Sequence, residues 1–116
     1  MSMSISADEI FSKITDAAEG AFKDGWHAVK TYAPAEFKKM SVQLAEIVEN
    51  VALYEVDNEQ GYSPQTGKVL FKMQRTACEA VLVAVTHLTL IAVQKAINAI
   101  MKVLRDIFSG IIAAVI

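Results

Sequence analysis

Three glutamates have the residue type that a di-metal carboxylate bundle needs. Glu46 and Glu49 are three residues apart, and Glu79 falls in the next expected helix. Such sites use Glu-x-x-His motifs on facing helices. The residue three positions after Glu49 is Ala52, and the one three positions after Glu79 is Leu82. Because the motif is missing, a structural role is the favoured interpretation, and a di-metal site is a distant third hypothesis for the protein.

The two histidines and the single cysteine form no recognisable catalytic pattern. His27 and His87 are separated by 59 intervening residues and are expected to lie far apart, each at the edge of an apolar face. Cys78 stands in an apolar run with no base nearby in sequence, which is typical of a small buried hydrophobic residue. The glycine-rich phosphate loops and the CxxC pattern are also missing. We therefore expect no enzyme, no cofactor, no metal site and no small-molecule substrate.

The most distinctive part of the sequence is its apolar C-terminal stretch. Between residues 77 and 93, thirteen of seventeen residues are apolar, and residues 77–116 contain no proline and one glycine, Gly110. On a helical wheel the polar residues from His87 to Ser109 gather in an arc of roughly 120°, which leaves an apolar arc of roughly 240°. An apolar arc this wide must be covered from two or more sides.

The spacing of apolar residues predicts an all-α fold, because no stretch of useful length alternates with period two. A first helix is expected over about residues 7–32, since Ser6 and Glu9 have the spacing of a capping box. Pro34 disfavours helical geometry in the residue before it, so this helix should stop or kink near Tyr32.

A second helix is expected over about residues 34–57, where proline suits the first helical position. Its apolar residues repeat at alternating steps of three and four, which is the pattern of a heptad seam. The seam consists of Phe37, Met40, Leu44, Ile47, Val51 and Tyr54. Residues 58–63 have turn composition and are predicted to join this helix to a third in a tight hairpin.

The third helix is expected to be continuous over about residues 64–115, since no breaker lies between Gly67 and Gly110. The alternative is a break near residues 86–89, which gives a compact intramolecular bundle of four helices. If the helix is continuous, the first two helices cannot cover its apolar arc. The predicted fold is then a single-domain helical hairpin or bundle with one long apolar C-terminal helix, whose core is completed by homo-oligomerisation. The predicted oligomer interface consists of Val81, Val83, Val85, Leu88, Leu90, Ile97, Ile100, Leu104, Ile107, Phe108 and Ile111.

Composition and charge exclude some classes of protein. With 116 residues of which 53% are hydrophobic, the chain can bury a modest core and is not a disordered one. The net charge of -2 conceals a split: residues 1–63 hold five Lys/Arg against eleven Asp/Glu, and residues 64–116 hold six against two. The halves therefore carry -6 and +4. This split favours antiparallel pairing of one half against the other and argues against a nucleic-acid partner.

These observations favour a small structural or interaction protein that assembles with itself into a ring, bundle or filament. The general plan, a helical hairpin whose apolar C-terminal helix polymerises, is similar to that of secretion-filament and needle subunits. The alternative is a membrane-active protein of the phage-lysis or toxin type, with residues 81–93 entering lipid. The N-terminus lacks the features of a cleaved signal, so we expect a cytoplasmic protein or one exported without cleavage, with membrane association as the alternative location.

Overall fold

A computed structural model describes residues 6–116 of the chain, and all regular elements in that range are helical, which confirms the predicted all-α class. The molecule is elongated, with extents of 45 × 21 × 19 Å. Its elements are α1 (Ala7–Phe22), the 3₁₀ turn η1 (Lys23–Gly25), α2 (Trp26–Val29), α3 (Ala33–Val56), α4 (Pro64–Thr86), α5 (Leu90–Ile107) and α6 (Ile111–Val115).

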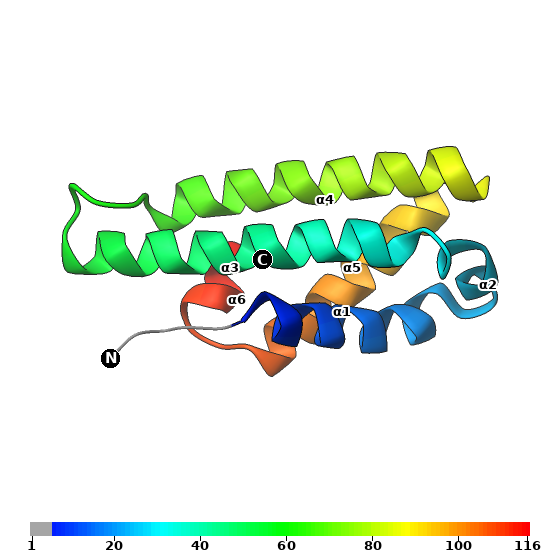
Figure 1. Ribbon diagram of the computed structural model, residues 1–116, viewed down its shortest axis with the longest axis horizontal. Coiled ribbons are helices and arrows are strands. Elements are labelled where there is room, and N and C mark those ends of the chain that lie inside the picture. The colour runs from blue at the N-terminus through cyan, green and yellow to red at the C-terminus, as the bar shows by residue number, and fades with distance from the viewer. Residues whose placement is uncertain (1–5) are drawn as a thin grey trace.

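The four long helices pack in a closed ring (Figure 1). Helices α3 and α4 form an antiparallel hairpin along the long axis, α1 packs against α3, and α5 lies between α1 and α4. The short α6 turns back and packs against both helices of the hairpin. Every long helix therefore has two neighbours, and each can bury an apolar stripe on two sides.

The first helix begins where its capping signal predicts and ends earlier than expected. The Ser6 side chain accepts a hydrogen bond of 3.0 Å from the backbone N–H of Glu9. The prediction of one helix over residues 7–32 is wrong, because α1 ends at Phe22 and Lys23 adopts a φ of 54°. A residue with a positive φ interrupts a regular right-handed helix. The chain then continues through η1 and α2 before α3 starts.

The predicted continuous helix over residues 64–115 is also wrong, and the break near residues 86–89 is the arrangement found. Helix α4 ends at Thr86, and His87 adopts a left-handed conformation with φ 63° and ψ 9°. The Thr86 hydroxyl accepts a hydrogen bond from the Leu88 N–H, and the Thr89 side chain accepts one of 3.1 Å from Ala92 N–H. Side-chain oxygens thus replace backbone partners on both sides of the corner, which is why the chain can turn within an apolar run.

We expect His87→Gly to stabilise the protein and His87→Val to destabilise it. Glycine adopts the left-handed conformation without a Cβ penalty, whereas a β-branched residue meets a larger one. The gain for glycine should be up to about 1 kcal/mol, because its greater freedom in the unfolded chain offsets part of the relief. Thermal denaturation followed by circular dichroism measures both changes, and equal effects of the two substitutions would contradict this account of the corner.

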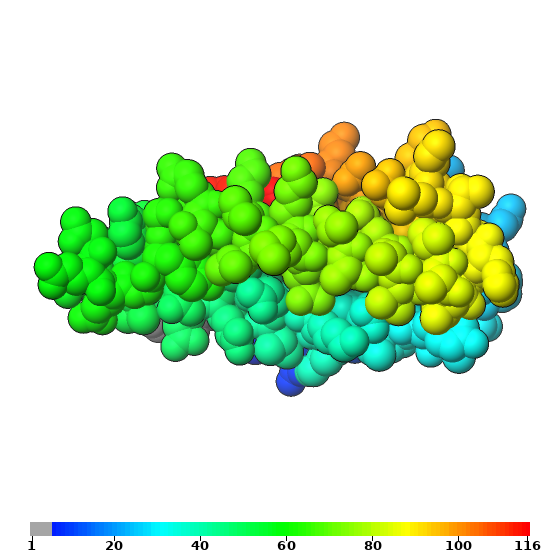
Figure 2. Space-filling view, turned by 90° about the horizontal axis from the view of Figure 1, so that it is seen from above, coloured from blue at the N-terminus to red at the C-terminus, as the bar shows by residue number. Residues whose placement is uncertain are grey.

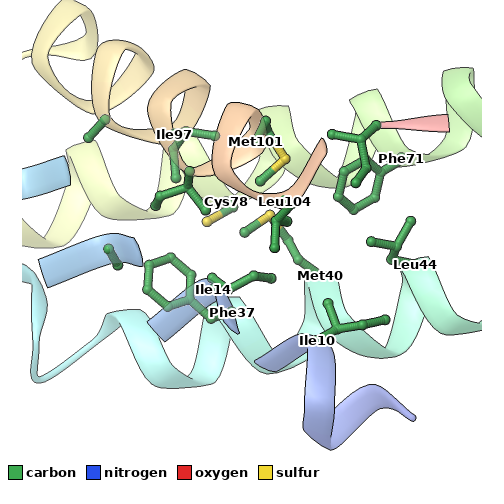
Figure 3. Packing of buried hydrophobic residues seen from close by; sticks show 14 of the residues in the cluster. Ile10, Ile14, Phe37, Met40, Leu44, Phe71, Cys78, Ile97, Met101 and Leu104 are labelled. Carbon is green, nitrogen blue, oxygen red and sulfur yellow. The ribbon is translucent and has the colours of Figure 1, made fainter. Parts of the chain in front are cut away.

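The break lets the chain cover its own apolar arc. Figure 3 shows side chains of α5, among them Ile97, Met101 and Leu104, facing Phe37 and Met40 of α3 across the interior. All five are fully buried. The first five positions of the predicted heptad seam are likewise buried in the protomer, so the seam packs against its own bundle. Part of the apolar surface that was expected to need other copies is therefore buried within one chain.

Candidate interaction surfaces

The structure divides the predicted oligomer interface into three groups. Four of its members lie inside the protomer and pack on their own chain: Ile97, Ile100, Leu104 and Phe108. Four others are half-buried: Val81, Val83, Leu88 and Ile111. Three remain exposed: Val85, Leu90 and Ile107. Only the exposed group is fully available to a second copy, so an interface must be sought among the side chains that the bundle leaves outside.

The exposed large apolar side chains concentrate at the two ends of the bundle. Seven of the eleven belong to two groups, and the other four, Val42, Met73, Val103 and Ile107, are on the sides of the helices. One group consists of Leu53, Val56 and Val69, and the other of Tyr32, Val85, Leu90 and Ile91. We call the exposed side chains of residues 53–69 the apex surface and those of residues 23–32 and 85–95 the corner surface. Figure 2 shows the apex in green at one extremity and the α4–α5 corner in yellow at the other.

The apex surface is a structured turn with an acidic border. An Asp57 carboxylate oxygen accepts a hydrogen bond of 3.0 Å from the Glu59 N–H. Gly61, at φ 59°, lies so close to the Asn50 carbonyl that a Cβ there would be 2.0 Å from its oxygen. Val56, the last residue of α3 before this turn, is 90% exposed. Three exposed acids and one exposed lysine border it: Glu55, Asp57, Glu59 and Lys68, with a formal sum of -2.

The corner surface combines two connections that are distant in sequence. Leu88 of the α4–α5 corner packs against the segment before α2, since a Cβ on Gly25 would lie 3.4 Å from its side chain. Ile91 is 67% exposed beside this contact. The exposed charges are Lys23, Lys30 and Lys95 against Asp24, with a formal sum of +2.

Both histidines belong to the corner surface. His27 lies in α2 and His87 is the left-handed residue between α4 and α5, and both are exposed. They were expected to belong to distant parts of the molecule, but the break at residues 86–89 and the short α2 are at the same end of the bundle (Figure 1). No local sequence signal places these two segments at one end, since that depends on how the helices pack.

The acidic and basic halves of the chain pack against each other, α3 antiparallel to α4 and α1 against α5, but in the described range no ion pair within 4 Å joins them. Within residues 6–116, the ion pairs closer than 4 Å are Lys38–Asp8 at 2.7 Å and Lys39–Glu36 at 3.1 Å. Both join residues of the acidic half. The hydrogen bond from Lys38 lowers the pKa of Asp8. In the described range the exposed charges of residues 64–116 form no ion pair within 4 Å and stay available to solvent or to another molecule; they are Lys68, Lys72, Lys95, Lys102, Arg105 and Asp106.

Glu79 is a buried carboxylate on α4. It is 7% exposed, and burial raises its pKa, with the positive charge of Arg75 acting in the opposite direction. Arg75 lies one turn before Glu79 on the same helix but forms no ion pair with it within 4 Å, because the guanidinium donates a hydrogen bond of 3.5 Å to the Asn98 side-chain oxygen instead. The neighbouring Cys78 is fully buried, and burial together with the nearby carboxylates of Glu36 and Glu79 raises its pKa to about 12. This thiol stays protonated and is a poor nucleophile.

We expect Glu79→Gln to stabilise the protein at neutral pH. The folded state raises the pKa of this carboxyl, so the wild type loses stability as the pH rises through the folded value, whereas the amide does not titrate. At neutral pH the gain should be roughly 1 kcal/mol, the scale of one poorly compensated buried polar group. Urea denaturation at pH 4 and pH 7 measures the difference, which should shrink at pH 4. A destabilised Glu79→Gln at pH 7 would show that the carboxylate has a favourable partner.

The residues weighed for a di-metal site do not converge. Glu46 and Glu49 are exposed on α3, while Glu79 is buried on α4. Within the described range no three His, Cys, Asp or Glu side chains are grouped so that they could hold one metal ion. Among the helices of residues 6–116, none combines the length and the apolarity required to cross a bilayer.

Comparison with known proteins assigns the chain to no group: no family model matches it, and no curated protein or solved structure is significantly similar to it.

Proposed function

We propose that the protein is a structural subunit that assembles with copies of itself. The observation that carries this proposal is the concentration of seven of the eleven exposed large apolar side chains at the two ends of the bundle. Exposed apolar side chains scattered singly are ordinary on a monomer, but clustered ones with a charged border are typical of protein contacts. The proposed role is one of assembly and not of catalysis.

The sides of the bundle provide a contrast with its ends. The outward-facing residues of α1 include Asp8, Glu9, Asp16 and Glu19, all exposed. Those of α5 beyond the corner include Asn98, Lys102 and Arg105, also exposed. Charged helix faces of this kind are stable in water without a partner. The larger share of the exposed apolar side chains, seven of the eleven, is therefore at the ends.

The proposal differs from the expectation that α5 itself completes a core between copies. Ile97, Ile100 and Leu104 are buried within the protomer, so they take no part in contacts between copies. Folded copies can associate through exposed residues without opening the bundle. Association through exposed residues alone can be reversible and dependent on concentration, because each copy is stable before it meets another.

Light scattering coupled to size exclusion, over a wide range of protein concentration, tests the proposal. We expect a mass above the 12.7 kDa of one chain that rises with concentration in plain buffer. A mass of one chain at every concentration up to about 1 mM, the scale of a very weak complex, would refute it. The same measurement with a mild detergent separates the membrane alternative: a protein that is dispersed only by detergent would favour lipid as its partner.

A further inference from the structure

The charges and apolar residues at the two ends suggest how copies meet. We infer that the protein assembles end to end, with the apex surface of one copy docked on the corner surface of the next. This inference rests on the proposed function, and it goes further by naming the two surfaces and the geometry of the assembly. The occupant of each surface is a second copy of this chain.

The first argument is charge complementarity. The apex surface carries a formal charge of -2 and the corner surface +2, so an apex attracts a corner and repels another apex. In the described range no ion pair within 4 Å ties Glu55, Glu59, Lys30 or Lys95 to its own bundle. These four side chains are free to face charges on a neighbouring molecule.

The second argument is that both surfaces present apolar side chains inside their charged borders. Val56 and Val69 are 90% and 60% exposed at the apex, and Ile91 and Leu90 are 67% and 49% exposed at the corner. Exposed apolar side chains accompanied by charged ones are typical of an interface, in which apolar residues supply affinity and charged residues supply orientation.

The geometry makes the expected assembly an open chain. The two surfaces lie at opposite ends of the 45 Å axis (Figure 2). A copy inside a linear assembly therefore uses both of its surfaces. The assembly as a whole still has one free apex at one end and one free corner at the other. A contact between two different surfaces grows into a filament when the rotation between copies does not close a ring. A symmetric dimer through two apexes would instead place like charges together.

A charge-reversal experiment tests the pairing. The apex variant carries Glu55→Lys and Glu59→Lys, and the corner variant carries Lys30→Glu and Lys95→Glu. All four residues are exposed, so both variants should keep the helical circular dichroism of the wild type. At a concentration where the wild type has at least twice the mass of one chain, each variant alone should fall to the mass of one chain. An equimolar mixture of the two should recover the wild-type mass, because each altered surface then meets a complementary one.

A matched control distinguishes the effect of charge at the apex from the effect of the net charge of the molecule. Glu9→Lys with Asp16→Lys changes the net charge by the same amount as the apex variant, but on the side of α1, where both residues are exposed. We expect this control to retain the wild-type mass. If the wild type assembles and the apex and corner variants assemble equally well, the end-to-end inference is overturned while the proposed function stands. If the wild type stays at the mass of one chain, the proposed function itself fails.

Cross-linking gives a second readout that does not depend on charge. Val56→Cys and Ile91→Cys each place a thiol on one end, while the native Cys78 is fully buried. A short bis-maleimide should join the two variants through their added, exposed cysteines when they are mixed, with at least a tenfold higher yield than either variant alone. Equal yields for the mixture and for each variant alone would overturn the inference.

Discussion

Ile100→Asp should abolish the cooperative unfolding transition, whereas Leu90→Asp should leave the bundle folded. Ile100 is fully buried on α5. Removing its side chain alone costs about 2–5 kcal/mol, and an unpaired buried carboxylate adds several more. A domain of this size has a free energy of unfolding of about 5–15 kcal/mol, so the sum removes most or all of it. Thermal denaturation followed by circular dichroism should show no cooperative step.

Leu90 is the matched position on the same helix. Its side chain is 49% exposed, and it is the first residue of α5, directly after the Thr89 cap. An aspartate there can reach water and meets the positive end of the helix dipole. We expect a change in stability within about 1 kcal/mol, the range typical of exposed positions, together with weaker self-association. Loss of folding in both variants would mean that α5 depends on contacts with other copies, as the continuous-helix prediction required.

Gly67→Leu should destabilise the protein by about 3 kcal/mol, the upper part of the range for overpacked cores. Gly67 lies in the first turn of α4, where a Cβ would be 2.7 Å from Ile47 Cγ2 and 3.3 Å from both Val51 and Val115. These three neighbours are β-branched and have little rotamer freedom, so they cannot move aside without shifting backbone. Because Val115 belongs to α6, the larger residue should also displace this short helix. Urea denaturation measures the loss of stability, and amide exchange of α6 measures its release.

Gly20→Ala is the control for the backbone effect of replacing a helical glycine. Gly20 lies in the exposed part of α1, and a Cβ there would meet nothing within 4 Å. Alanine should therefore stabilise the helix by about 0.5–1 kcal/mol. If Gly67→Ala stabilised the protein as much as Gly20→Ala, the close packing of α4, α3 and α6 at Gly67 would be contradicted.

Sequence signals that involve residues three or four positions apart were sufficient to predict the helical class and the first residues of several helices. Ser6 caps α1 through Glu9, as the capping-box spacing predicts, and Ser63 accepts a hydrogen bond from the Thr66 N–H at the start of α4. These contacts form within one turn of helix, so the sequence contains both partners. The same is true of the apolar face of α3, which must be buried whatever covers it.

Signals of this kind were not sufficient to predict which residues form the candidate surfaces. The exposure of Ile91 and Val56 depends on what the rest of the bundle leaves uncovered, and neither was among the residues predicted to meet another copy. The opposite charges of the two halves were visible in the sequence. The opposite charges of the two ends of the bundle were not, because Lys23 and Lys30 of the corner surface belong to the acidic half, and they join Lys95 only through the positions of α2 and of the α4–α5 corner in space.

The sequence by itself determined that this protein is helical and that its C-terminal stretch must be covered on several sides. Only the tertiary structure decided what covers it. A left-handed His87 costs about 1–2 kcal/mol locally, so a continuous helix is the better local solution. Breaking the helix lets α5 fold back and bury Ile97, Ile100 and Leu104 between α1 and α4, and each fully buried side chain contributes about 1.5–3 kcal/mol. The long-range gain exceeds the local cost, and it appears only when the partners from the other helices are in place.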